Sequence, residues 1–71
     1  MNATMLAIAY RNAVHNGAAG DPNEIMISAF VAAFGREPVY PVDVEGDATL
    51  AATEAEDFAM VQEAFRMVRA G

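Results

Sequence analysis

The sequence contains no cysteine and a single histidine, His15, and these absences exclude several kinds of chemistry. Disulfide bonds and thiolate metal sites need cysteine, and a zinc site within one chain needs more than one imidazole. No glycine-rich phosphate loop follows an expected strand, and no nucleophile motif accompanies His15. We therefore expect a protein that is not an enzyme and that holds no cofactor.

Lysine is also absent, so the four basic residues are all arginine, against ten acidic residues and a net charge of −6. Residues 1–36 are balanced, residues 37–63 hold eight carboxylates and no basic residue, and residues 64–71 carry two arginines. Binding to nucleic acid or to an anionic membrane requires Lys and Arg to neutralise phosphate. The charge therefore predicts no direct contact with either, and a protein partner with a basic surface.

No apolar run approaches the roughly 20 residues that cross a bilayer. The N-terminus, MNATMLAIAYRN, lacks the basic flank and cleavage pattern of a signal peptide, so a cytoplasmic location is expected. Hydrophobic residues make up 55% of the chain, which indicates an ordered globular protein. We expect one small helical domain over residues 1–71, with oligomerisation as a supplement, because so short a chain buries only roughly 60% of its unfolded surface.

Helix signals predict a mainly α fold with three helices. The first helix should cover about residues 3–16 and stop at Asn16-Gly17, where glycine adopts the left-handed conformation at low cost. The GAAG loop is short enough to return the second helix antiparallel to the first. Asp21-Pro22-Asn23-Glu24 should start that helix, because it supplies an N-cap, a proline in the first turn and a capping-box glutamate, and Gly35 should end it. The first helix should bury the stripe Leu6, Tyr10, Ala13 and Val14.

Residues 25–34 read IMISAFVAAF and are apolar around the whole helix except at Ser28. A helix that is apolar on every side must be covered on every side, which two other helices of a short chain can hardly do. One interpretation is therefore a subunit interface; the other is a central helix in a compact three-helix fold. The predicted interface residues are Ile25, Met26, Ile27, Phe30, Val31 and Phe34.

The third element is predicted to be a long C-terminal amphipathic helix with two alternative starts. It can begin at a capping box that opens with Thr53, or directly after an Asp47 cap. Asp57 interrupts its apolar face, and it should either lie at an edge or pair with Arg11 or Arg36. The apolar face comprises Phe58, Val61, Phe65 and Val68.

Between the second and third helices lies the stretch GREPVYPVDVEGD, residues 35–47. Its two prolines forbid a continuing helix, its valines favour strand, and residues 45–47 favour a turn. We leave two alternatives open for this segment. It forms an extended crossover, or it forms a short β-hairpin in which Val42 and Val44 face Leu50 and Ala48.

The leading functional hypothesis is a small acidic regulatory or inhibitory protein that docks on a basic protein surface. One version imitates the phosphates of nucleic acid, by analogy of composition with small acidic helical proteins of mobile elements. The alternatives are a structural homo-oligomer with the second helix at the subunit contact, and a charge that serves only solubility. The predicted partner-binding residues are Glu37, Tyr40, Asp43, Glu45, Asp47, Glu54 and Glu56.

A third hypothesis is calcium binding. Asp43, Glu45, Asp47 and Glu54 stand at the first, third, fifth and twelfth positions of an EF-hand loop. However, Ala48 replaces the glycine of the sixth position, and prolines replace the entering helix. The alternative is a solvated acidic loop.

Overall fold

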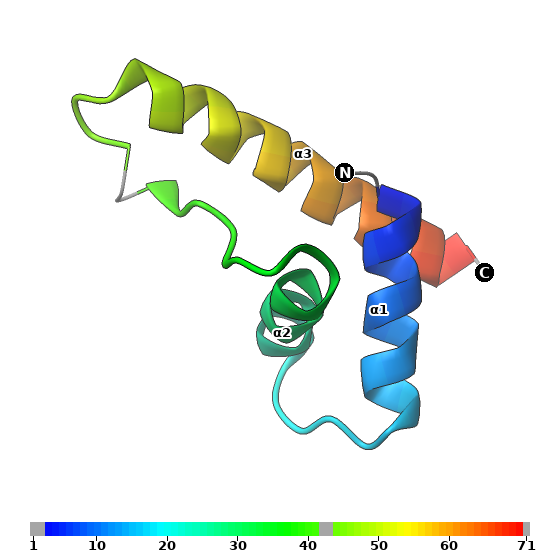
Figure 1. The fold of residues 1–71 in the computed structure, drawn as a ribbon. Coiled ribbons are helices and arrows are strands. Elements are labelled where there is room, and N and C mark those ends of the chain that lie inside the picture. Colours follow the sequence, from blue (N-terminus) through cyan, green and yellow to red (C-terminus); the bar gives the residue numbers. More distant parts are fainter. Residues whose placement is uncertain (1–2, 42–43, 71) are drawn as a thin grey trace.

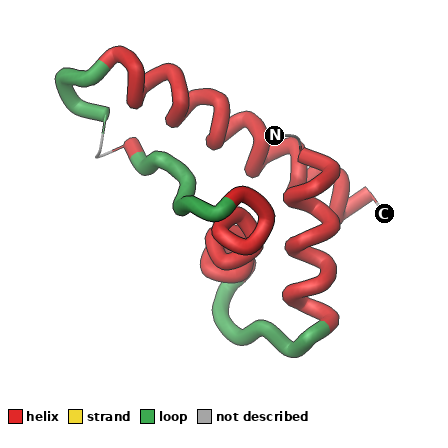
Figure 2. The backbone as a smooth tube through the Cα atoms, in the orientation of Figure 1, coloured by secondary structure: helices red, strands yellow, loops and turns green. Residues whose placement is uncertain are grey.

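The computed structural model describes residues 3–41 and 44–70, and within these residues it contains three helices and no strand (Figures 1 and 2). Helix α1 is Ala3–His15, α2 is Pro22–Phe34 and α3 is Ala48–Ala70. The prediction of a mainly α fold is confirmed. Within this described part, none of the helices is both long enough and apolar enough to cross a membrane.

Helix α1 ends as the Asn16-Gly17 pair predicts. Gly17 has a φ of 85°, its N–H donates to the carbonyl of Val14, and the N–H of Ala18 donates to the carbonyl of Ala13. These two bonds form a Schellman motif, which satisfies carbonyls that the last helical turn leaves without partners. The chain therefore leaves the helix in a fixed direction.

Helix α2 has the predicted cap at each end. The Asp21 carboxylate accepts a hydrogen bond of 3.0 Å from the N–H of Glu24, and Pro22 is the first helical residue. At the other end Gly35 has a φ of 74°, and its N–H donates to the carbonyl of Val31. A residue with a side chain rarely adopts this left-handed conformation, so glycine fixes the turn into Arg36.

Helix α3 begins after Asp47, the second of the two predicted starts. The Asp47 carboxylate accepts hydrogen bonds from the N–H groups of Thr49 and Leu50, and the predicted turn precedes it, with the Asp47 N–H donating to the carbonyl of Val44. The hairpin prediction is wrong, because Ala48 and Leu50, which it places on a strand, belong to α3. Val42 lies outside the described residues. Alanine and leucine have high helix propensity, and the Asp47 cap stabilises the first turn. An isolated pair of strands is only marginally stable, so the helix is favoured here.

The two N-terminal helices cross steeply rather than forming the predicted antiparallel pair. In Figure 1, α1 lies in the plane of the view whereas α2 is seen nearly end-on, and α1 packs against both α2 and α3. The core between them is small and closely packed, which is why alanine lies at several of its central positions. It consists of Leu6, Ala7, Met26, Ala29, Phe30 and Ala64.

The predicted stripe on α1 is correct only in part. Leu6 is fully buried and Tyr10 packs against the core, but Val14 is 48% exposed, and the buried residue beside Leu6 is Ala7. The first half of α3 projects beyond α1 and α2, so the molecule measures 39 × 22 × 19 Å (Figure 2). The crossover, defined as residues 35–41, leaves α2 and runs toward this projecting half.

Candidate functional site

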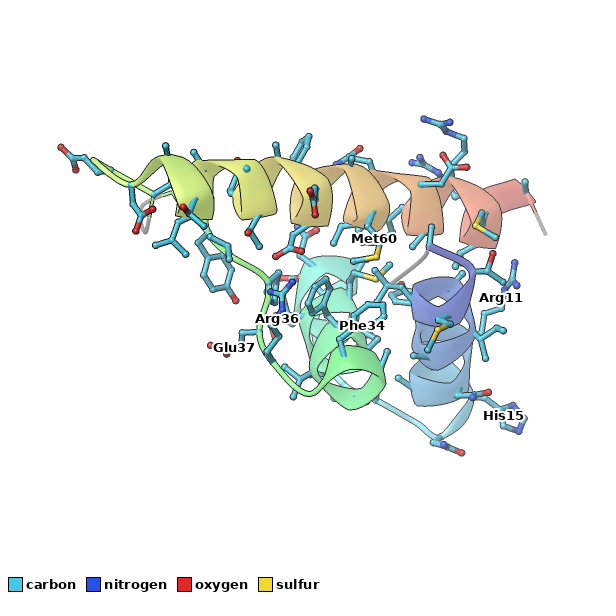
Figure 3. The ribbon with its side chains drawn as sticks, turned by 45° about the horizontal axis from the view of Figure 1, so that its top comes forward. Arg11, His15, Phe34, Arg36, Glu37 and Met60 are labelled. Carbon is cyan, nitrogen blue, oxygen red and sulfur yellow. The ribbon has the colours of Figure 1, made fainter. Side chains whose placement is uncertain are left out.

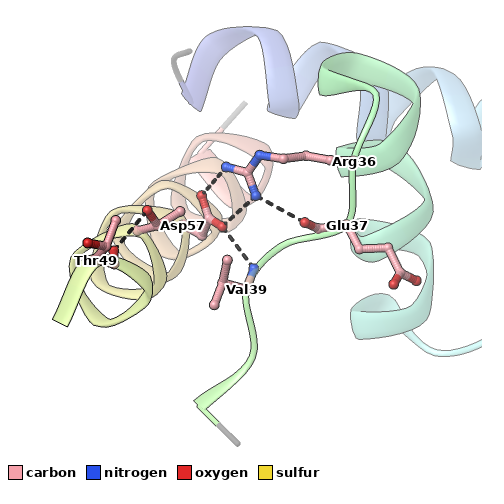
Figure 4. Close-up of polar contacts among 6 residues, drawn as sticks. Arg36, Glu37, Val39, Thr49 and Asp57 are labelled. Atoms are coloured by element: carbon pink, nitrogen blue, oxygen red, sulfur yellow. Dashed lines mark hydrogen bonds and ion pairs between the residues drawn. The ribbon is translucent and has the colours of Figure 1, made fainter. Parts of the chain in front are cut away.

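The centre of the site is an ion pair between the crossover and α3. The Arg36 guanidinium donates through Nη2 to Oδ1 of Asp57 and through Nη1 to Oδ2, at 2.9 Å in each case (Figure 4). Arg36 follows directly on the left-handed Gly35, and Asp57 lies on the face of α3 that is turned toward the core. The bidentate geometry matches the planar guanidinium to the carboxylate, so it fixes the orientation of both groups.

Two further hydrogen bonds fasten the crossover to this ion pair. The N–H of Val39 donates to Oδ2 of Asp57 at 2.9 Å, and Nη1 of Arg36 donates to the carbonyl of Glu37 at 3.0 Å. The guanidinium carbon also lies 5.2 Å from the centre of the Phe30 ring, within the range of a cation–π contact. We call Arg36, Asp57 and the Val39 N–H the clamp, because together they tie the extended chain to α2 and α3.

Burial decides the electrostatics of the clamp. The Asp57 side chain is 1% exposed, whereas the Arg36 side chain is 38% exposed. Burial alone would raise the pKa of Asp57, but the hydrogen bonds from Arg36 and Val39 and the positive charge of Arg36 together hold that pKa below its usual value. The hydrogen bond to Asp57 raises the pKa of Arg36 in turn. Asp57 is therefore a buried anion that depends on its partner.

The sequence left open whether Asp57 pairs with Arg11 or with Arg36, and the structure selects Arg36. Arg11 instead donates to the carbonyl of Met67 at 2.9 Å, near the end of α3 (Figure 3). In the described part of the chain, every buried side-chain nitrogen or oxygen atom has a hydrogen-bond partner. The clamp is thus a satisfied polar cluster within an otherwise apolar interior.

Five of the predicted partner-binding carboxylates lie in the described part of the chain, and they share one property. The two ion pairs found there use Asp57, with Arg36, and Glu63, with Arg66 at 2.8 Å. The other carboxylates after Arg36 consequently have no cationic partner among the described residues. We call them the acidic surface: Glu37, Glu45, Asp47, Glu54 and Glu56.

The acidic surface follows the crossover, the turn and the first half of α3. Glu37, Glu45, Asp47 and Glu56 are exposed, and Glu54 is half-buried. Asp47 also caps α3, so its carboxylate has a structural role as well. Tyr40 is half-buried in the wall of a groove, and Asp43 lies outside the described residues.

The groove lies between the start of α2, the crossover and one edge of α3. One part of it has a volume of about 240 Å³ and is lined mainly by apolar side chains, among them Tyr40, Phe58 and Val61. A second hollow of about 430 Å³ continues past Asn23, Gln62 and Phe65 toward Arg69. The apolar part is smaller than the roughly 300 Å³ or more of typical small-molecule pockets.

The most prominent apolar group along this groove is Phe58, which is 60% exposed although the sequence placed it on the apolar face of α3. Val61 and Phe65 are half-buried beside it, and Phe65 packs edge-on against Tyr10 with ring centres 5.7 Å apart. The groove edge of α3 is thus apolar and incompletely covered.

The predicted subunit-interface residues on α2 mostly face the interior of this chain. Ile25, Met26 and Phe30 are buried, and Phe34 packs against Phe30 with ring centres 4.9 Å apart. Ile27 lines the groove, while Val31 is 40% exposed. The crossed helices therefore cover more of α2 than its sequence suggested.

Of the proposed calcium loop, Glu54 at the twelfth position lies within α3, because the chain is helical from Ala48 onward. Among the described residues no group of three or more metal-ligating side chains is gathered. Asp43, the first position of the proposed loop, lies outside them.

Comparisons with family models, with curated proteins and with solved structures gave no match. The interpretation of the site therefore depends on its own geometry and charge.

Proposed function

We propose that this protein is a non-enzymatic interaction module, a small acidic regulatory or inhibitory protein that docks on a basic surface of another protein. The observation that supports the proposal is that some carboxylates are paired with arginine within the chain and others are not. Asp57 and Glu63 are neutralised within the chain, whereas the five carboxylates of the acidic surface have no ion-pair partner among the residues that the structure describes. A surface of one sign speeds association with a partner of the opposite sign and rejects partners of the same sign.

The clamp supports this proposal by fixing the crossover from which Glu37 projects. Because Arg36 and the Val39 N–H both bind Asp57, the extended crossover cannot move freely relative to α3. The backbone of Glu37 is then fixed through its carbonyl, while its side chain points away from α3 (Figure 4). A surface that is already ordered loses less conformational entropy when it binds. Imitation of a phosphate backbone is one form that such recognition can take.

A pair of charge reversals tests the proposal. Glu45→Lys changes a member of the acidic surface, and Glu24→Lys makes the same change of net charge on the first turn of α2. Partners captured from host lysate by the wild-type protein would be purified and titrated against both variants. We expect Glu45→Lys to weaken binding by about tenfold and Glu24→Lys to change it less than about threefold.

Salt provides the second readout. Affinity for the purified partner should fall as ionic strength rises, because salt screens exposed charges beyond about 8 Å. Equal effects of the two reversals, or an affinity that salt leaves unchanged, would refute docking through the acidic surface. Thermal melting of each variant separates weakened binding from loss of the fold.

A structural homo-oligomer remains the second candidate. The size of the chain favours it, since a 71-residue domain without disulfides has few other means of adding stability. The sequence predicts that α2 makes the subunit contact, and Val31 is the large apolar residue that α2 exposes.

A further inference from the structure

The groove edge of α3 carries a pattern that is complementary to itself when reversed. Along this edge the chain presents Glu54, then Phe58, then Val61 and Gln62, then Phe65 and finally Arg69. The order along the edge is therefore an anion, an aromatic ring, the pair Val61 and Gln62, a second aromatic ring and a cation. We infer that this edge binds the same edge of a second copy of the chain, with the two α3 helices antiparallel around a two-fold axis. The inference does not rest on the proposed function, with which it shares only Glu54 of the acidic surface.

The register follows from the spacing of these residues. With the axis between Val61 and Gln62, Phe58 faces Phe65 of the second copy and Glu54 faces its Arg69. Each of these pairs occurs twice, because a two-fold axis repeats every contact. The edge from Glu54 to Arg69 spans about 22 Å at 1.5 Å per residue, a contact of about four helical turns.

The exposed groups at this edge are those that such a contact would cover. Phe58 is 60% exposed, and Gln62 and Arg69 are also exposed. Among the described residues neither Glu54 nor Arg69 has an ion-pair partner in its own chain. A neighbouring helix would shield both aromatic rings from water and would supply the missing opposite charges.

The antiparallel direction is favoured by the acidic surface as well. A parallel pair would place the two acidic ends side by side, whereas an antiparallel pair separates them by about the length of the contact. That separation exceeds the Debye length of about 8 Å at physiological ionic strength, so repulsion between the two copies is largely screened. The dimer would then carry one acidic surface at each end.

Removing the exposed ring tests the apolar part of the contact. Sedimentation equilibrium or light scattering should show the wild-type protein as a dimer at about 100 µM. Phe58→Ser should weaken dimerisation by about 100-fold or more, because the symmetry buries this ring twice. The control is Ile8→Ser, which removes a side chain that is 51% exposed on α1, and it should leave dimerisation unchanged.

Charge reversal tests the register. Glu54→Arg alone places arginine opposite arginine twice in its homodimer, and Arg69→Glu alone places glutamate opposite glutamate twice. Each should weaken self-association by about tenfold. An equimolar mixture of the two variants should nevertheless form a heterodimer, because both of its charge pairs are then complementary.

The inference is overturned if the wild-type protein stays monomeric at about 1 mM, or if Phe58→Ser and Ile8→Ser have equal effects. It is also overturned if the mixture associates no more tightly than the separate variants. The mixing experiment does not depend on Phe58→Ser being folded, because both charge variants keep the apolar residues of α3.

Discussion

The asymmetry of burial across the clamp predicts that its two halves are not equally important for stability. In Arg36→Met, the Asp57 carboxylate would remain 1% exposed with the Val39 N–H as its remaining donor from the clamp. Removing one partner of a buried ion pair costs about 3–5 kcal/mol, because an uncompensated charge stays buried. In Asp57→Asn, by contrast, the group left over is Arg36, whose side chain is 38% exposed and can be rehydrated. We expect that variant to lose only about 2 kcal/mol.

The dependence on pH distinguishes this explanation from a simple loss of packing. Without the positive charge, burial should raise the pKa of Asp57 above its unfolded value of about 3.9. A buried acid with a raised pKa destabilises the fold when it is ionised, so Arg36→Met should become more stable as the pH falls from about 7 to about 5. Asp57→Asn has no carboxylate at this position and should show no such gain.

Urea unfolding followed by circular dichroism at both pH values measures these free energies. The total stability of so small a domain is roughly 3–5 kcal/mol, so Arg36→Met can be partly unfolded at neutral pH and should then refold on acidification. Equal losses for the two variants at neutral pH would refute the reasoning, as would an Arg36→Met variant whose stability falls between pH 7 and pH 5. Either result would mean that Asp57 is not a buried anion held by Arg36.

The wild-type protein should show the opposite dependence on acid, because Asp57 has a lowered pKa in the folded state. The stability that it contributes is present above about pH 4 and is lost as the pH falls through the folded-state pKa, which acid titration of the unfolding free energy would reveal. Asp47→Ala should cost about 1 kcal/mol by removing the N-cap of α3, and Thr53→Ala, at the unused alternative start, should cost less in the same urea assay. Gly35→Ala should also cost about 1 kcal/mol, because φ is 74° there, and a thermal melt unchanged by this substitution would contradict the left-handed cap.

The sequence was most informative at helix ends, where the physics is local. Helix α2 begins and ends where Asp21, Pro22 and Gly35 predict, because each of these residues acts on backbone groups within one helical turn. The start of α3 was one of two stated alternatives, and Asp47 proved to be the cap. Fold class follows from such signals, whereas the crossing of α1 and α2 does not. That crossing depends on how a six-residue loop directs the chain and on which small residues allow close approach.

The errors in the crossover have a different cause. Valine favours strand only where it can pack against a neighbouring strand or surface. The segment expected to pair with the crossover valines, around Ala48 and Leu50, is helical instead. The Val39 N–H is satisfied by the Asp57 side chain rather than by a strand. Asp57 was noticed in the sequence as an oddity on an apolar face, which was the available signal for the clamp. Its choice of Arg36 over Arg11 required three-dimensional proximity.

The clamp also determines how the molecule can open. The first half of α3 projects beyond α1 and α2, and the described contacts that tie it to the rest of the chain include the hydrogen bonds of Arg36 and Val39 to Asp57. If these bonds break, we expect the crossover and this half of the helix to lose an attachment together, because the core lies around Leu6 and Phe30 and not beside them. Local opening of this end of the molecule is therefore expected to cost less free energy than unfolding of the whole chain.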